Sequence, residues 1–113
     1  ASIKESSLVF DVYRVEGVDV YGSFLISASL KDSNENDIYR INGEALAALK
    51  KDQIKNYYIA KVKPGKHSLI IPLGAKATIN LNDNKFNQLS KGKYTLTLTD
   101  VSGIFWEKEI IIK

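Results

Sequence analysis

The chain has 113 residues, a net charge of +3, 44% apolar residues and 26% charged residues, which is ordinary for one soluble globular domain. It contains no cysteine, no methionine and one histidine, so disulfides and thiol catalysis are excluded and a His-based zinc site lacks ligands. No apolar run approaches the ~20 residues that span a bilayer. We therefore expect a single domain over residues 1–113, with no membrane insertion.

Alternation of apolar and polar residues predicts strands in the first half of the chain. The pattern has a period of two, which places successive side chains on opposite faces of a sheet. In the clearest strand we expect Ile26 and Ala28 to face inward and Leu25 to face outward. The strands predicted in this half are residues 8–13, 21–30 and 38–41.

One segment is compatible with a helix. Residues 44–51 include the run Ala45-Leu46-Ala47-Ala48-Leu49, and the dipeptide Asn42-Gly43 before it is a turn signal. A helix this short is marginal in water and must be held by packing. We expect it to bridge the two sheets.

The second half of the chain continues the strand pattern. The strands predicted here are residues 57–63, 67–71, 75–81, 94–99 and 104–112. Lys63-Pro64-Gly65-Lys66 between the first two fits a type II turn. In the last strand, Lys108 shares a face with Trp106 and Ile110, so either Lys108 lies beyond the edge of the core or a bulge resets the register.

The most informative motif is Leu89-Ser90-Lys91-Gly92-Lys93-Tyr94, which runs into an alternating strand. A tyrosine at the start of such a strand is typical of the tyrosine corner of a β-sandwich, in which the hydroxyl bonds back to the upstream backbone. Gly92 permits the sharp turn that the corner needs. The sequence thus predicts an all-β fold, an immunoglobulin-like antiparallel β-sandwich of seven to eight strands.

A polar loop, residues 32–37 (Asp-Ser-Asn-Glu-Asn-Asp), is rich in side-chain oxygens. Its first five positions match the opening of an EF-hand, but Asp37 and Gly43 stand where that loop requires Gly and Glu. We expect a solvated hairpin loop, with calcium binding as the alternative.

Two aromatic dipeptides cannot bury both of their rings on a strand. In Phe105-Trp106 and Tyr57-Tyr58, neighbouring side chains point to opposite faces. We expect Phe105 and Tyr57 to be the exposed members. Exposed rings of this kind favour half-covered edge positions, or alternatively a platform that stacks on sugars.

The strongest candidate for a binding surface is the basic segment around Pro64. Loops carry most binding contacts, and a proline reduces the cost of ordering a loop. The chain contains no G-x-S-x-G nucleophile elbow and no metal-ligand cluster, so we expect no enzymatic activity and no cofactor. Its scattered lysines argue against nucleic acid as a partner. We expect another protein to bind the following residues: Lys61, Lys63, Pro64, Lys66 and His67.

Residues 89–112 resemble the closing hairpin of bacterial immunoglobulin-like modules. The match is Gly92-Lys93-Tyr94, the strand after it, and the acidic turn Asp100-Val101-Ser102-Gly103. The resemblance implies the sandwich fold but no role, because one fold hosts many functions. The N-P-T-T-G and G-x-G-G motifs of the chagasin-like protease inhibitors do not occur in this chain.

These observations predict a non-catalytic protein-binding module of an exported or cell-envelope protein, for example a peptidase inhibitor or a prodomain-like chaperone. The alternative is a carbohydrate-binding accessory module that uses the aromatic residues Tyr57, Tyr58, Phe105 or Trp106. We expect a secreted or periplasmic location. A small residue such as Ala1 is what signal-peptide cleavage leaves, although a cloning scar would look the same.

Overall fold

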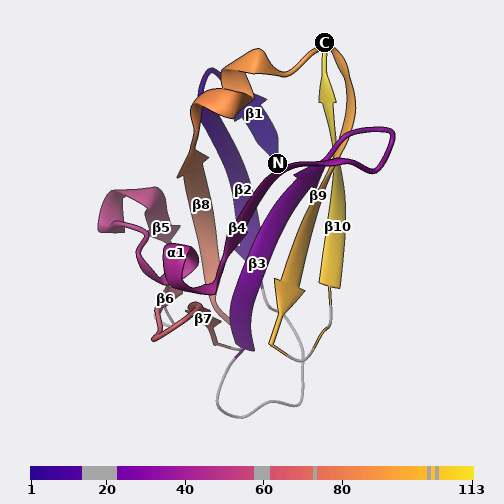
Figure 1. Cartoon of the computed structure of the whole chain (residues 1–113). Helices are drawn as coiled ribbons and strands as arrows, with labels where there is room; N and C mark the ends of the chain where they lie inside the picture. The colour runs from indigo at the N-terminus through magenta and orange to yellow at the C-terminus, as the bar shows by residue number, and fades with distance from the viewer. Residues whose placement is uncertain (14–22, 58–61, 73, 102, 104) are drawn as a thin grey trace.

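Two antiparallel sheets packed face to face form the protein (Figure 1). The structure, a computed structural model, describes residues 1–13, 23–57, 62–72, 74–101, 103 and 105–113. The first sheet, sheet A, has the strand order β1 (Ser2–Lys4), β2 (Ser7–Tyr13), β8 (Lys76–Asn82) and β5 (Ile54–Asn56). The predicted all-β sandwich is confirmed.

The second sheet, sheet B, is the larger one. Its order is β10 (Phe105–Ile112), β9 (Gly92–Asp100), β3 (Ser23–Lys31), β7 (Leu69–Ile71) and β6 (Lys63–Pro64). β4 (Asp37–Asn42) pairs with the later part of β3, on the edge whose earlier part pairs with β7. The described residues thus form ten strands, more than the seven or eight predicted, because β1 and β5 (Ile54–Asn56) lie where no strand was predicted.

The core lies between the two sheets and follows the predicted alternation closely. Ala75, just before β8, and Ala77, Ile79 and Leu81 on β8 are at most 1% exposed. Leu8 and Phe10 of β2 cover the same layer, and Leu30 and Leu96 face them from sheet B. Burial of these apolar side chains is the main favourable term that holds the sheets together.

β3 departs from the predicted facing. Leu25 was expected to face outward, and this prediction is wrong: the side chain is 1% exposed and belongs to the core. The register between β3 and β9 shifts between Leu25 and Ser27. A β-bulge of this kind adds one residue to one strand of the pair. The side chains before and after it therefore no longer alternate strictly between the two faces of the sheet.

The predicted helix is shorter and begins earlier than expected. α1 spans Gly43–Ala47, with Asn42 as its N-cap, and a 3-10 turn follows at Lys51–Gln53. Asn42-Gly43 therefore opens a helix instead of closing a hairpin. α1 buries Leu46, and the strands that it contacts most, β3, β4, β6 and β7, all belong to sheet B, so it packs on that sheet and was wrongly expected to bridge the two. A second 3-10 helix, η2, spans Asn84–Gln88.

The tyrosine corner is present. Tyr94 is 5% exposed, and its hydroxyl donates a hydrogen bond of 2.7 Å to the backbone oxygen of Ser90. Gly92 has a φ of 147°, a conformation that favours glycine. The corner ties the chain that enters β9 to the core layer of the sandwich.

The register of β10 settles the position of Lys108. β10 pairs with β9 without a break from Phe105↔Thr99 to Ile112↔Gly92. No bulge intervenes, so Lys108 lies on the core-facing side of β10 but beyond the covered core, and it is exposed. The first of the two predicted alternatives is confirmed.

We predict that Tyr94→Phe lowers the free energy of unfolding by ~1–3 kcal/mol, because the Ser90 carbonyl loses its donor in a partly buried setting. Denaturant unfolding measures the effect. Tyr39→Phe is the matched control: its ring is half-buried against Phe86, and its hydroxyl makes no hydrogen bond within the described residues. We expect that control to change stability by no more than about 0.5 kcal/mol. An unchanged midpoint in Tyr94→Phe would contradict the role of the corner.

Candidate functional site

The predicted binding segment forms an exposed hairpin at the edge of sheet B. Lys63 and Pro64 make up β6, and Lys66 and His67 form the tip between β6 and β7. All four residues are exposed. Lys61, the fifth predicted residue, lies outside the described residues. The tight turn of the hairpin lies at residues 65–68, two residues after the predicted type II turn at residues 63–66. The shift arises because Pro64 takes part in the β6–β7 pairing.

Three contacts hold this basic hairpin in place. The Asn56 side chain bonds both backbone groups of Val62: it accepts from the N–H at 2.8 Å and donates to the oxygen at 3.4 Å. Gly65 donates from its N–H to the Ser68 oxygen at 2.7 Å across the tip. At Gly43, an added Cβ would overlap the backbone oxygen of His67. The hairpin is thus fixed against β5 and α1 before any partner arrives.

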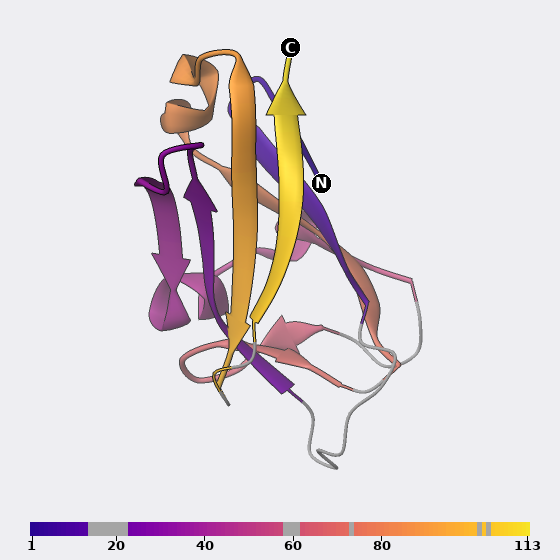
Figure 2. The ribbon, with the colours of Figure 1, turned by 90° about the vertical axis from the view of Figure 1, so that its right-hand side faces the viewer.

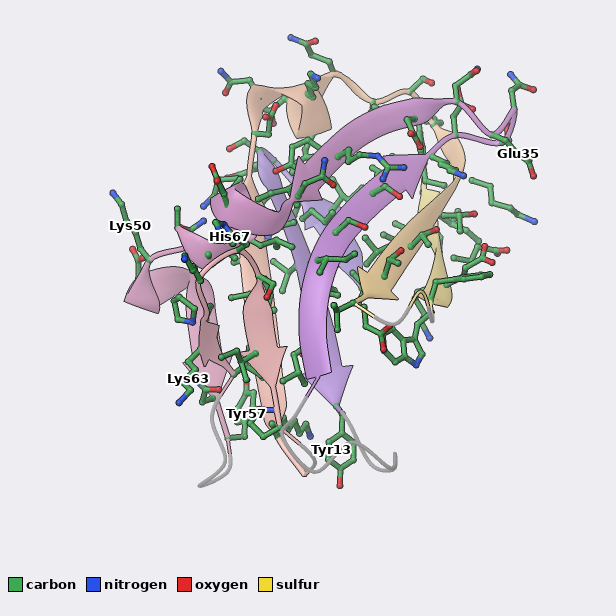
Figure 3. All side chains as sticks on the ribbon, turned by 60° about the horizontal axis from the view of Figure 1, so that its bottom comes forward. Tyr13, Glu35, Lys50, Tyr57, Lys63 and His67 are labelled. Carbon is green, nitrogen blue, oxygen red and sulfur yellow. The ribbon has the colours of Figure 1, made fainter. Side chains whose placement is uncertain are left out.

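The electrostatics of the hairpin are those of an open basic surface. Figure 3 shows Lys50, Lys63 and His67 on the same side of the molecule. The only carboxylate near the tip in the described residues is that of Glu44, whose Oε1 lies 3.5 Å from His67 Nδ1, with both side chains largely exposed. Such an exposed contact contributes little to stability. The surface can attract an anionic partner, but it contains no arrangement for acid–base chemistry.

The outer face of sheet A carries a tyrosine–lysine cluster that the sequence analysis did not find. Lys76 Nζ lies 5.9 Å from the ring centre of Tyr13 and 5.6 Å from that of Tyr57. Lys55 Nζ also lies 5.4 Å from the ring centre of Tyr57. These cation–π contacts connect the ends of β2, β8 and β5, which Figure 3 shows for the two labelled tyrosines. Only the strand pairing brings these residues together.

The exposed aromatic residues do not form one platform. Tyr57 is 48% exposed and Phe105 is 58% exposed, as predicted, and Trp106 is also 47% exposed. Phe105 and Trp106 point to opposite faces of β10, and Tyr57 lies on the other sheet. Tyr58 lies outside the described residues. Tyr57, Phe105 and Trp106 therefore do not form the shared platform that stacking on a sugar chain requires.

The oxygen-rich loop is organised by Asp32. Its Oδ1 accepts from the backbone N–H of Asn34 at 2.9 Å and of Asn36 at 3.0 Å. The bond from Asn36 is the main cause that lowers the pKa of Asp32 below its ordinary value. Two backbone donors thus occupy Oδ1 of Asp32, and Glu35, labelled in Figure 3, has the left-handed φ of 64° that completes the turn. The arrangement is that of an Asx turn.

The described residues contain no group of three or more His, Cys, Asp or Glu side chains placed to hold a metal ion. None of their helices has the length and apolar character needed to cross a bilayer.

Comparison with protein-family models finds a match over residues 1–109 to the family described as TQO small subunit DoxA. The match runs from the first residue into the last strand, so it includes the whole described sandwich up to Glu109. Searches of curated proteins and of solved structures return no match.

This match overturns the function predicted from the sequence. A small subunit of an enzyme assembly is neither a peptidase inhibitor or chaperone-like binding module of an envelope protein nor a carbohydrate-binding module. The resemblance to immunoglobulin-like modules holds for the β-sandwich, but the family found is not an immunoglobulin-like one. The error has a physical reason: the tyrosine corner stabilises a scaffold and contains no information about what the scaffold binds.

We predict that the Asp32 carboxyl titrates below the ordinary aspartate value of 3.8 and that the loop ignores calcium. A folded-state pKa below the unfolded one gives stability that is complete above the unfolded pKa and is lost as the pH falls through the folded pKa. Carbon-detected NMR measures the titration. Amide shifts at Asn34 and Asn36 that saturate with calcium would contradict the assignment.

Proposed function

The chain belongs to the family described as TQO small subunit DoxA, and we propose that it is the non-catalytic small subunit of an oxidoreductase complex. Its role would be to bind and position the larger subunit, which would carry the redox chemistry. The family match over nearly the whole chain is the observation that carries this proposal. The secreted or periplasmic location expected from the sequence stays a prediction.

The residue types of the chain support a non-catalytic role. Redox centres in proteins are held mainly by cysteine thiolates, histidine imidazoles and methionine thioethers. This chain has no cysteine, no methionine and a single histidine. That histidine, His67, is exposed at a hairpin tip next to one glutamate. The usual ligands for haem, copper or iron–sulfur centres are therefore not available within the subunit.

The shape of the molecule supports a positioning role. A sandwich with a continuous buried core is a rigid body, and the basic hairpin projects from one edge of it (Figure 1). Pro64 and the two hydrogen bonds between the Asn56 side chain and the Val62 backbone reduce the conformational entropy that the hairpin loses on binding. We propose that Lys63, Pro64, Lys66 and His67 contact an acidic surface of the larger subunit, with Lys61 as the flanking residue.

The proposed role is tested by separating the subunits of the purified complex. We expect all bound redox cofactor to stay with the larger subunit. Returning the small subunit should raise the melting temperature of the larger one in a concentration-dependent manner, because a ligand that binds only the folded state stabilises it. Cofactor absorbance that leaves with the small subunit would contradict the non-catalytic role.

We predict that the double change Lys63→Glu and Lys66→Glu slows association with the larger subunit by about tenfold at low salt, and that the difference shrinks as salt is added. Stopped-flow or surface-binding kinetics measure the rate. The matched control is Lys85→Glu with Lys91→Glu, which changes the net charge equally at exposed positions beside η2. Equal effects of the two pairs would show that net charge, and not the hairpin, steers binding.

A further inference from the structure

Asn42-Gly43 is the only Asn-Gly dipeptide of the chain, and the proposed function leaves it without a role. Asparagine is among the least durable residues of proteins, because the backbone nitrogen of the next residue can attack its side-chain amide carbon. Glycine at the next position hinders this attack least, since it has no side chain. The dipeptide therefore marks a place at which the chain can modify itself without an enzyme.

The structure leaves both reacting groups of this dipeptide free of helical hydrogen bonds. Asn42 is the last residue of β4, where it pairs with Ser27 of β3, and it is exposed. Although Asn42 is the N-cap residue of α1, its side chain makes no capping hydrogen bond. Gly43 is the first residue of α1, so its N–H has no intrahelical partner. Neither the amide carbon nor the attacking nitrogen is thus held by the helix.

A contact with the basic hairpin holds the reacting atoms apart. The backbone at Asn42 is extended, with a ψ of 168°, and ring closure requires this angle to turn until the Gly43 nitrogen approaches the side-chain carbon. The turn moves Gly43, which lies so close to the backbone oxygen of His67 that an added Cβ would overlap it. Figure 2 shows the tip of the β6–β7 hairpin beside α1. The hairpin therefore has to move away before the ring can close.

We propose that Asn42 is a deamidation site and that the contact between Gly43 and His67 sets its rate. The Gly43 nitrogen forms a bond to Cγ of Asn42, the bond from Cγ to Nδ2 breaks, and ammonia leaves with the proton of the Gly43 N–H. Water then opens the resulting succinimide ring at one of its two carbonyls, which gives aspartate or isoaspartate. The sum is the hydrolysis of one amide to a carboxylate, so water is the only co-reactant.

Local opening of the hairpin makes this rate a property of the fold. A segment that opens and recloses quickly reacts at the rate of its open form multiplied by the fraction that is open. Two hydrogen bonds between the Asn56 side chain and the Val62 backbone hold the hairpin, and a third joins Gly65 to Ser68 across the tip. Loosening these contacts raises the open fraction and hence the rate at which Asn42 converts.

The two products alter the hairpin in different ways. Aspartate adds a negative charge at the end of β4, next to the contact with His67. Isoaspartate adds a methylene to the backbone at a contact that has no room for one methyl group, so α1 and the hairpin cannot both keep their positions. We expect the isoaspartate form to exchange its Gly65 amide hydrogen faster, and to unfold at a lower denaturant concentration, than the unmodified chain.

Peptide mass spectrometry of the chain, incubated folded and in denaturant under otherwise equal conditions, measures the conversion of each asparagine. We expect Asn42 to convert before every other asparagine of the folded chain, and about tenfold or more slowly than it does in denaturant. Asn42→Gln, whose longer side chain must close a six-membered ring, should abolish conversion at this position. Earlier conversion of another asparagine, or no conversion of Asn42 in either condition, overturns the site. Equal rates in the two conditions overturn the control by the hairpin.

Two variants loosen the hairpin without changing the reacting pair. Asn56→Ala removes both of its bonds to the hairpin, and Pro64→Gly removes a fixed φ. Each should speed the conversion of Asn42 in the folded chain, in proportion to the hydrogen exchange of the Gly65 amide, and denaturant below the unfolding midpoint should do the same without a substitution. The matched control is Asn82→Ala, which removes a side-chain bond at the end of β8 farthest from the hairpin (Figure 1) and should change neither rate. A conversion rate that stays constant while the Gly65 exchange rises overturns the proposal.

Discussion

The burial of two facing apolar layers is the constraint on which the rest of this structure depends. Leu8, Ile79 and Leu81 of sheet A are at most 1% exposed, and Leu30 and Leu96 face them from sheet B. Because each strand alternates its side chains, this single requirement also decides which residues of β2, β8 and β9 face solvent. The basic hairpin and the tyrosine–lysine cluster occupy the positions that remain outside the core once these layers are buried. Tyr94, whose hydroxyl bonds to Ser90, adds a polar tie to an otherwise apolar layer.

The core-facing side chains are not buried equally along the seam between β2 and β10. Trp106 is 47% exposed on the same face of β10 on which Ile110 is 4% exposed. Exposed apolar surface beside an open strand edge carries a risk of aggregation, and charged side chains are a common defence. Glu107, Lys108 and Glu109 follow Trp106 directly.

The function of this chain illustrates the difference between a scaffold and a role. The tyrosine corner and the strand pattern correctly indicated a β-sandwich, yet the function inferred from similar scaffolds was wrong, and the family match corrected it. A fold restricts chemistry only through the side chains that it displays. The chain has no cysteine or methionine and one exposed histidine, and these residue types are what support the proposed non-catalytic role.

The sequence by itself determined the features that depend on local pattern. The alternation of β8, the hydroxyl bond of Tyr94 and the exposure of Phe105 and Tyr57 follow from neighbouring residues, because a strand's two faces are set by its period. Tertiary structure decided what depends on pairing between distant segments. The bulge after Leu25 reversed one facing, the pairing of Pro64 with Leu69 moved the basic hairpin by two residues, and α1 began at Gly43 against His67. The relative lengths and registers of strands far apart in sequence are non-local quantities, and no local pattern of residues encodes them.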